Sequence, residues 1–432
     1  MKRFRPVGLF AATVLTVVAL AAGCSAPAGE PGPTSLPGPA QSSSRPSTPP
    51  SPSPGGSPSG GGSPSATPSP SATPSPSDPG TTPSAPPAAD PAPAEPDLSL
   101  VAGWTLEQKV GQVVMVGLPV KGPFQPTFDM VRSEHLGGVF LHGRTQAGRQ
   151  PVKNLVNAAV AASDAPVPLF VATDQEGGEV QVLRGKGFST IPSALDQARL
   201  APSDLRARSK VWGQELALAG VNLNLAPVMD LVPSATAASN APIGAFDRNY
   251  GYTSKSVIAH GDAFAEGQRA AGVQTAIKHF PGLGRVTANT DTTAGVTDTV
   301  TGPNNPSVTV FAAGIKDGTG LVMMSSAVYA RIDPKAPAVF SPKVVGLVRQ
   351  HGFHGVIITD DLSAAVQVQS VPAGQRAVRA VDAGVDLVLA SAKPSVAPAM
   401  VDALVKAARQ DPAFAAKVDA AAARVVAAKA GL

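Results

Sequence analysis

Charged side chains follow several short apolar runs of the sequence, each at the point where the run ends. These groups are Asp174 after 167–172, Asp230 after 221–228, Lys278 and His279 after 274–277, and Asp360 and Asp361 after 355–358. Apolar runs of this length predict buried strands, and in a parallel barrel the ends of such strands converge on one face. Carboxylates gathered there with a lysine and a histidine fit carbohydrate binding and acid–base or nucleophilic chemistry at an acetal. The pattern therefore predicts a polar catalytic site at the strand ends.

Ordinary structural roles also exist for single members of this group. Lys278 and His279 could form a satisfied structural pair, and Asp360 or Asp361 could cap the helix that follows them. Capping explains only one carboxylate of the Asp360–Asp361 pair. We therefore assign the chemistry to Asp360 and regard Asp361 as the better candidate for a cap.

The elements that must position these groups alternate along the chain from residue 98 onward. Strand-like apolar runs lie at 110–118, 138–141, 167–172, 221–228, 274–277, 320–324, 355–358 and 385–390. Stretches with helical periodicity lie at 203–219, 254–271, 307–315, 341–350 and 375–383. This alternation over 98–432 predicts an α/β domain, most economically a single (β/α)8 TIM-type barrel. The alternative is an open doubly wound sheet, but no Gly-x-Gly-x-x-Gly motif follows the first run, which disfavours a dinucleotide-binding version of that fold.

The first 23 residues have the features of a secretory signal peptide. A short basic start is followed by the apolar run 7–22, which ends in Leu-Ala-Ala-Gly before Cys24. The stretch ending at Cys24 resembles a bacterial lipobox, which implies cleavage before this cysteine and attachment of lipid to it. An ordinary signal peptide with a coincidental cysteine is the alternative. We expect a protein anchored to the cell membrane by lipid on Cys24, outside the cytoplasm.

Residues 24–97 consist mainly of proline, serine, glycine, threonine and alanine. Such a segment lacks the apolar surface needed to offset its chain entropy, so we predict a disordered tether. At roughly 3 Å per residue where extended, the tether could lift the barrel domain well over about 100 Å from a membrane. That reach would suit a cell-wall substrate, although a linker whose length has no consequence would look the same in sequence.

The overall charge gives no sign of a nucleic-acid partner. The net charge is +4 and the isoelectric point is about 9.2, but lysine and arginine are scattered and form no basic patch. The single cysteine excludes an intramolecular disulfide and a zinc cluster built from several cysteines.

Five motifs occur in a fixed order along the predicted barrel. They are Thr-Leu-Glu-Gln-Lys-Val-Gly-Gln at 105–112, Asp-Gln-Glu-Gly-Gly at 174–178, Asn-Leu-Asn-Leu-Ala-Pro-Val-Met-Asp at 222–230, Lys-His-Phe-Pro-Gly at 278–282 and Ile-Thr-Asp-Asp-Leu at 358–362. Their order and spacing resemble glycoside hydrolase family 3, and most of all its short, single-domain β-N-acetylglucosaminidases. The resemblance covers essentially all of 98–432. Many members carry a second α/β domain after the barrel, which we expect to be absent here.

The resemblance implies a retaining glycoside hydrolase that acts on β-linked N-acetylglucosaminides. It makes Asp360 the nucleophile that forms a covalent glycosyl-enzyme. It places four further side chains around the sugar hydroxyl groups, namely Asp174, Arg248, Lys278 and His279. It implies a carbohydrate as the partner and neither a metal nor an organic cofactor.

Three positions depart from the pattern of the short family enzymes. Those enzymes usually read Lys-His-Phe-Pro-Gly-His-Gly, followed on the same loop by Asp-Ser-His or Asp-Thr-His, whose histidine protonates the leaving oxygen. This chain has Leu283 in the first motif and Asp291-Thr292-Thr293 in the second. A threonine hydroxyl cannot replace the histidine as an acid at neutral pH. An arginine common after the Asp-Gln-Glu-Gly-Gly motif is also missing, and Arg184 could take its place.

Three explanations for the missing histidine are open at this point. Asp291 could itself donate the proton if the closed loop raised its pKa by burial. The enzyme could act mainly on substrates with good leaving groups, for which acid catalysis matters little. The chain could also be a surface-anchored pseudoenzyme that binds amino-sugar glycans without turnover.

The exact glycan is not fixed by these motifs. Family 3 barrels accept N-acetylglucosaminides, glucosides and other β-glycosides with small changes around the 2-substituent. We favour peptidoglycan fragments because the predicted lipid anchor and tether would hold the barrel near a cell wall.

Overall fold

The structure is a computed structural model and describes residues 95–432. The predicted signal peptide, the lipidation site Cys24 and nearly all of the predicted tether lie outside the described residues. Within 95–432, none of the helices combines the length and the apolar character needed to cross a membrane.

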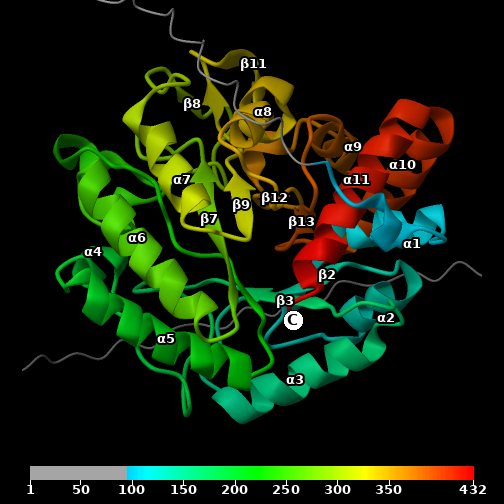
Figure 1. Ribbon diagram of the computed structural model, residues 1–432, viewed down its shortest axis with the longest axis horizontal. Helices are drawn as coiled ribbons and strands as arrows, with labels where there is room; N and C mark the ends of the chain where they lie inside the picture. Colours follow the sequence, from blue (N-terminus) through cyan, green and yellow to red (C-terminus); the bar gives the residue numbers. More distant parts are fainter. Residues whose placement is uncertain (1–94) are drawn as a thin grey trace, which may run out of the picture. The chain divides into compact units, whose positions relative to one another are not determined.

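Eight parallel strands form the centre of the domain (Figure 1). They are β1 Val114–Pro119, β2 Gly138–His142, β3 Phe170–Thr173, β6 Leu223–Asn224, β7 Gln274–Phe280, β9 Leu321–Met324, β12 Val356–Thr359 and β13 Val388–Ala390. The strands are hydrogen-bonded in the order β12-β9-β7-β6-β3-β2-β1-β13. A parallel bridge between Ile358 and Leu387 joins the two ends of this series. The sheet therefore closes on itself, which confirms the (β/α)8 barrel and shows that the doubly wound alternative is wrong.

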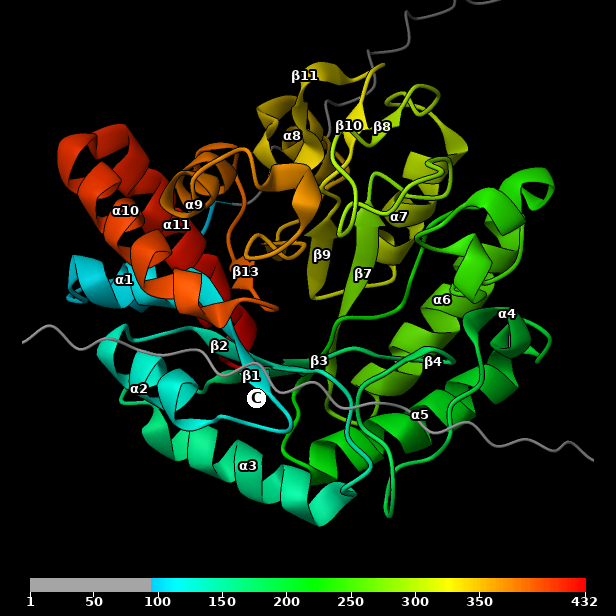
Figure 2. The same ribbon diagram turned by 180° about the vertical axis from the view of Figure 1, so that it is seen from behind.

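Helices surround the barrel on its outside (Figures 1 and 2). They are α1 Leu106–Gln112, α2 Gln125–Ser133, α3 Arg149–Ala162, α4 Ala194–Gln197, α5 Pro202–Leu218, α6 Ser254–Arg269, α7 Pro306–Lys316, α8 Pro342–Gln350, α9 Ala373–Asp382, α10 Ala397–Gln410 and α11 Pro412–Lys429. Several begin at a side-chain cap, for example Thr253 before α6 and Ser341 before α8, because these oxygens accept otherwise unpaired N–H groups of the first turn.

Short elements complete the loops between strands and helices. They are the hairpin β4 Gln175–Gly177 and β5 Val180–Gln181, the outer sheet of β8 Thr297–Asp298, β10 Val328–Tyr329 and β11 Asp333–Pro337, and the 3₁₀ helices η1 Leu98–Val101, η2 Ser234–Ser239, η3 Gly244–Phe246, η4 Ala338–Phe340, η5 Val366–Val368 and η6 Pro394–Val396.

Several strands are shorter in the structure than in the prediction, and two of them have a clear local cause. The run 110–118 begins inside α1, because Thr105 and Gln108 form a reciprocal capping box that starts a helix at Leu106. The run 221–228 keeps only two residues in regular pairing. Pro227 has no N–H to donate, and pairing resumes with the bridge between Val228 and Lys278.

Apolar side chains fill the barrel interior in layers. Phe140, Leu225, Met323 and Leu389 belong to a buried cluster inside the barrel, and all four also line the cavity described below. They come from β2, β9 and β13 and from the residue after β6, which are alternate strands of the barrel, as expected for one layer of a TIM-type core. This layer forms an apolar floor beneath the polar strand ends.

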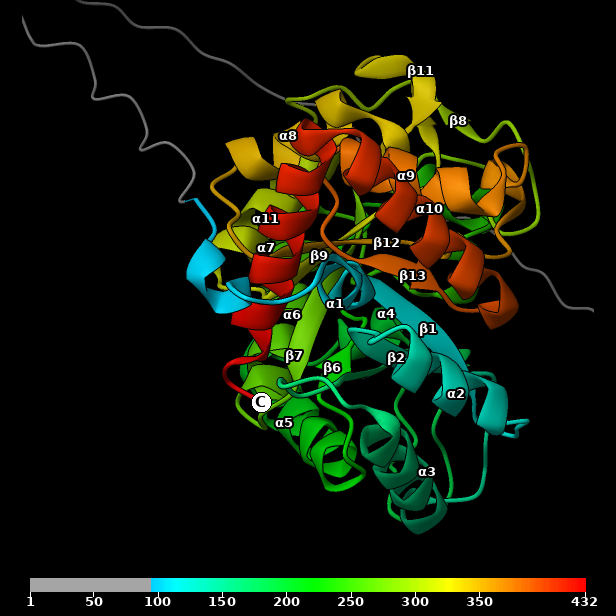
Figure 3. The ribbon, with the colours of Figure 1, turned by 90° about the vertical axis from the view of Figure 1, so that its right-hand side faces the viewer.

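The C-terminal helix α11 packs against α1, α10 and η1, and Figure 3 shows it running alongside the barrel. Near its end it sends Lys429 into the interior, where Nζ lies 2.6 Å from Oε1 of Gln112. The same ammonium lies 5.2 Å from the centre of the Phe170 ring. Burial lowers the pKa of Lys429 to about 7. Phe170 is the first residue of β3, so this lysine is at the opposite end of the barrel from the strand ends that carry Asp174 and Asp360.

Candidate active site

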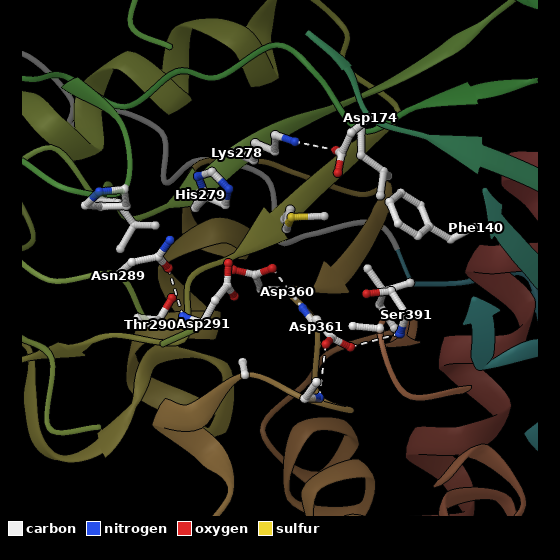
Figure 4. Close-up of a pocket in the computed structure, with 18 of the residues that line it drawn as sticks. Phe140, Asp174, Lys278, His279, Asn289, Thr290, Asp291, Asp360, Asp361 and Ser391 are labelled. Atoms are coloured by element: carbon white, nitrogen blue, oxygen red, sulfur yellow. Dashed lines mark hydrogen bonds and ion pairs between the residues drawn. The ribbon is translucent and has the colours of Figure 1, made fainter. Parts of the chain in front are cut away.

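A cavity of about 400 Å³ opens at the C-terminal ends of the barrel strands (Figure 4). Its lining includes all six residues predicted to bind or transform a substrate, namely Asp174, Arg248, Lys278, His279, Asp291 and Asp360. They come from the ends of β3, β7 and β12 and from the loops after β6 and β7, so the barrel brings together groups that are far apart in sequence. A cavity of this size is in the range used for small organic ligands.

A buried ion-pair network forms one wall of the cavity. Lys278 Nζ lies 2.6 Å from Asp174 Oδ1 and 2.6 Å from Glu176 Oε1. Arg248 holds Glu176 with both ends of its fork, through Nε at 2.9 Å and Nη2 at 2.8 Å. Asp174 and Arg248 line the cavity, whereas Glu176 is nearly fully buried behind them. The wall therefore presents fixed hydrogen-bond donors and acceptors to a ligand.

The opposite charges in this network keep Glu176 and Lys278 ionised although both are buried. Burial alone would raise the pKa of Glu176, but the cations of Arg248 and Lys278 lower it to about 2. Burial would likewise lower the pKa of Lys278, yet Asp174 and Glu176 raise it above its ordinary value. Glu176, Arg248 and Lys278 are therefore charged at neutral pH. Charge-assisted hydrogen bonds from such groups are well suited to fixing the hydroxyl groups of a sugar.

Asp230 holds His279 in place through hydrogen bonds. Its carboxylate lies 2.7 Å from His279 Nδ1 and accepts the backbone N–H groups of His279 and Leu283. Because a buried carboxylate in this setting accepts hydrogen bonds, Nδ1 carries the proton and Nε2 remains for other partners. Asp230 is fully buried and does not line the cavity. The strand-end carboxylate at this position thus orients a neighbouring side chain.

The two acids after β12 differ in their surroundings. Asp361 accepts the N–H groups of Ser363, Ala364 and Ser391, together with the hydroxyl of Ser363. It therefore ties the turn after β12 to the segment after β13. The predicted helix cap is wrong, because the chain after Asp361 forms a turn, and the next helix, η5, begins at Val366 with Ala365 as its N-cap residue. Asp360 accepts one bond, from the Asp361 N–H, and its carboxylate faces the cavity.

Asp291 reaches the same cavity from the loop that follows β7. Its N–H donates to Oδ1 of Asn289 at 2.8 Å, which helps to turn the chain at this point. Burial by the surrounding protein and then the negative charge of Asp360 raise the pKa of Asp291 to about 6. Part of the Asp291 side chain remains exposed to solvent. Figure 4 shows both carboxyl groups pointing into the cavity.

Of the three positions discussed as departures from the family motifs, only Leu283 lines the cavity. Thr293 is exposed and is not part of the cavity lining, so its hydroxyl does not take the place of a histidine. Leu283 is buried and lines the cavity as an apolar group. Arg184 does not line the cavity, since its Nη2 donates to the carbonyl oxygen of Gly178 at 2.6 Å.

Several residues of the site were not predicted from the sequence. Glu176 was visible only as the third residue of an Asp-Gln-Glu motif, and its role depends on cations that are distant in sequence. Ser391 and Asn289 line the cavity from loops that have no distinctive sequence pattern. Phe140 lay inside a predicted strand, but its chemistry gave no reason to place it in a site.

Comparison with known proteins identifies the family. A family model described as the glycosyl hydrolase family 3 N-terminal domain matches residues 105–428. The chain belongs to glycosyl hydrolase family 3. The matched range includes the whole set of barrel strands and every residue that lines the cavity.

Individual relatives agree with this family assignment. A crystal structure of a β-N-acetylhexosaminidase from Beutenbergia cavernae DSM 12333 has 55% sequence identity and a TM-score of 0.75, over 76% of this chain and 99% of that chain. A family 3 β-N-acetylglucosaminidase structure from Paenibacillus sp. str. FPU-7 has 29% identity and a TM-score of 0.68, over 76% and 63%. A curated β-hexosaminidase of Stenotrophomonas maltophilia (strain R551-3) is 33% identical over 276 residues, which are 60% of this chain and 78% of the relative. The chain is thus an O-glycosyl hydrolase of family 3 that resembles β-N-acetylhexosaminidases.

Proposed function

We propose that this family 3 hydrolase cleaves β-linked N-acetylglucosaminides with retention of configuration, using Asp360 as nucleophile and Asp291 as the general acid and base. The proposal depends chiefly on one observation: Asp291 and Asp360 face the same cavity, and the pKa of Asp291 is raised to about 6. Most glycosidases use two catalytic carboxyl groups, one of which is protonated near neutral pH. The names of the relatives support an N-acetylhexosaminide as the substrate.

In the first step, the Asp360 carboxylate attacks the anomeric carbon while Asp291 donates its proton to the glycosidic oxygen. The bond from the anomeric carbon to that oxygen breaks, the alcohol leaves, and an ester forms between Asp360 and the sugar. In the second step, Asp291 takes a proton from water, and the resulting oxygen displaces Asp360 from the anomeric carbon. The products are the free sugar and the regenerated pair of carboxyl groups.

The same two residues explain how Asp291 can change from acid to base. In the free enzyme the negative charge of Asp360 helps to keep the proton on Asp291. That charge disappears when Asp360 becomes an ester. We therefore expect the pKa of Asp291 to fall in the intermediate, so that it becomes able to accept a proton from water.

The rest of the cavity would hold the sugar. Asp174, Lys278 and Arg248 offer charged partners for hydroxyl groups, and His279 is oriented by Asp230 so that Nε2 remains available. The apolar floor could lie against the C–H groups of the sugar ring. No metal or organic cofactor has a part in this mechanism.

The location of the enzyme is also a proposal. We infer from the sequence of 1–97 that lipid on Cys24 holds the protein on the outer face of the cell membrane and that a tether separates it from the barrel. A hydrolase in that position would meet peptidoglycan fragments, which contain β-linked N-acetylglucosamine. Mass spectrometry of the mature N-terminus would show a lipid-modified Cys24, whereas an unmodified or uncleaved terminus would contradict this location.

Replacing Asp291 by asparagine tests the proposed acid. With the purified full chain, Asp291→Asn should slow hydrolysis of an N-acetylglucosamine disaccharide by about 10² to 10⁴-fold, because the alcohol then leaves unprotonated. With an aryl N-acetyl-β-glucosaminide that has a good leaving group, formation of the glycosyl-enzyme should be slowed much less by Asp291→Asn.

The pH profile gives an independent check on the same residue. In the wild type, disaccharide hydrolysis should fall as pH rises above about 6, since Asp291 must be protonated to act as an acid. Asp291→Asn should remove this basic limb. Equal losses on both substrates would contradict an acid role for Asp291, and wild-type binding without turnover of either substrate would show a carbohydrate-binding pseudoenzyme.

A further inference from the structure

The loop that carries Asp291 is attached directly to the loop that carries Asp360. We call 281–296 the acid loop and 360–371 the nucleophile loop. The N–H of Val366 donates to the carbonyl oxygen of Asp291 at 3.2 Å, and the N–H of Gln367 donates to that of Thr290 at 3.0 Å. The backbone of the proposed acid is therefore bonded to the loop that begins with the proposed nucleophile.

The side chain of Gln367 adds a second attachment further along the acid loop. Its Nε2 donates to the carbonyl oxygen of Val296 at 3.1 Å, and its Oε1 accepts the N–H of the same residue at 2.9 Å. Gln367 is only 8% exposed, and Val296 is buried as well. The side-chain amide thus forms two hydrogen bonds with the backbone of Val296, as a neighbouring strand would. Both groups have their hydrogen bonds fulfilled away from solvent.

Gln367 consequently holds two points of the acid loop, Thr290 through its backbone and Val296 through its side chain. Asp291 is the residue directly after the first of these points. The stretch 291–295 lies between them, so its ends are fixed to one residue of the nucleophile loop. A shift of either end would move the Asp291 carboxyl relative to Asp360.

The beginning of the acid loop is fixed in a different way. Asn240 Nδ2 donates to the carbonyl oxygens of Leu283 and Val286, both at 2.7 Å, and Asp230 accepts the Leu283 N–H. Gly284 packs so closely that an added Cβ would lie 2.0 Å from the carbonyl oxygen of Leu231. These contacts fix the loop to the segment after β6. They do not involve the nucleophile loop, whereas the contacts at 290, 291 and 296 join the two loops directly. The carbonyl oxygen of Val296 also accepts the N–H of Val328 in β10 at 3.0 Å.

We infer that Gln367 is a positioning residue that sets the separation of the Asp291 and Asp360 carboxyl groups. This inference rests on the proposed function of the two acids. Separation matters because a retaining mechanism requires the carboxyl groups to lie about 5 Å apart, and a wider gap admits water between them. It also matters because the charge of Asp360 helps to raise the pKa of Asp291, and this effect weakens with distance.

Gln367→Ala removes the side-chain attachment and leaves the backbone bonds in place. We expect hydrolysis of an N-acetylglucosamine disaccharide to fall by about 10-fold or more in kcat, with little change in KM, because the acid is misplaced while the sugar subsite is intact. Hydrolysis of the aryl substrate should change by less than about 3-fold when formation of the glycosyl-enzyme is measured, since that step needs little acid. The basic limb of the disaccharide profile should move to lower pH than in the wild type.

Gln369→Ala is the matched control. Gln369 is a glutamine of the same loop, but its Nε2 donates to the carbonyl oxygens of Ser363 and Ala365, within the nucleophile loop itself. This variant should have the substrate preference and pH profile of the wild type. If thermal unfolding shows that Gln367→Ala is poorly folded, Gln367→Glu provides a second test. The glutamate keeps the oxygen that accepts the Val296 N–H and loses the N–H that donates to the Val296 carbonyl oxygen. It should give the same selective loss on the disaccharide.

The outcomes separate this inference from the proposed function. If Asp291→Asn loses disaccharide activity selectively but folded Gln367→Ala and Gln367→Glu match the wild type in rate and pH profile, Gln367 does not position the acid. Equal losses on both substrates in the Gln367 variants, with an unmoved basic limb, would also overturn the inference, because they indicate general disruption of the site. If Asp291→Asn itself has no selective effect, the proposed function fails and the inference fails with it.

Discussion

The two ends of the barrel each bury a lysine, and the two lysines have opposite surroundings. Lys278 at the C-terminal end lies between the carboxylates of Asp174 and Glu176, which raise its pKa. Lys429 at the N-terminal end contacts the neutral amide of Gln112 and the ring of Phe170, and burial lowers its pKa to about 7. Burial alone therefore does not decide whether a lysine stays charged. The partners decide it, and the end of the barrel with charged partners is the end with the cavity.

This difference indicates separate roles for the two ends. Paired charges at the C-terminal end are costly to bury, and they are useful only if a ligand exploits their fixed donors and acceptors. The lysine at the N-terminal end is the last residue of α11; it is buried and does not line the cavity. The positive charge of Lys278 therefore matters at the C-terminal end, whereas Lys429 mainly fills space at the N-terminal end.

Lys278→Met should have the largest effect. It leaves the buried Glu176 and the adjacent Asp174 without their shared cation, and breaking a buried ion pair in this way costs about 3 to 5 kcal/mol. Turnover should fall by at least about 100-fold, because the sugar-binding wall loses its geometry. Thermal or denaturant unfolding and steady-state kinetics would check both effects. Near wild-type stability would show that the paired charges are not what distinguishes this end of the barrel.

Lys429→Met should have a much smaller effect on both properties. The substitution removes a group whose charged form is disfavoured by burial and leaves the Gln112 oxygen without its donor, so we expect a change in stability within about 2 kcal/mol at neutral pH. Turnover per folded molecule should be unchanged. A loss of turnover as large as that of Lys278→Met would contradict the separation of roles.

The pH dependence of stability should sharpen the same comparison. The pKa of Lys429 is about 7 in the folded state and near its ordinary higher value in the unfolded chain. Between these values the unfolded chain binds more protons, so stability rises with pH. The cost of this lysine is thus fully present below about pH 7 and disappears as pH rises toward about 10. Denaturant unfolding of wild type and Lys429→Met across this range should show the wild type gaining stability relative to the variant, and parallel curves would contradict the lowered pKa.

The sequence allowed the barrel and the set of strand-end residues to be predicted, because the signals for them are local. Buried strands appear as short apolar runs, and a polar group at the end of a run needs only the barrel geometry to reach the common face. The exceptions have local causes as well, since the capping box at Thr105 and the proline at 227 changed two strand boundaries.

Contacts between distant loops could not be predicted in this way. Gln367 pairs with Val296 across 71 positions, and Lys429 reaches Gln112 across 317 positions. In the sequence, Gln367 and Lys429 look like ordinary surface residues, because neither their residue type nor their spacing indicates a buried contact. Glu176 was hidden for a related reason, because its importance depends on Lys278 and Arg248 arriving from other strands.

Chemical rescue by azide tests the central claim most directly. In Asp291→Ala, an aryl N-acetyl-β-glucosaminide should still form the ester with Asp360, and azide should occupy the space of the lost carboxyl group and attack from the face that the leaving group vacated. We predict faster turnover with azide and a β-glycosyl azide as the product. Asp360→Ala should instead give only the α-glycosyl azide, if it reacts at all. An α-azide from Asp291→Ala, or no rescue, would contradict the assignment of Asp291 as the acid and base.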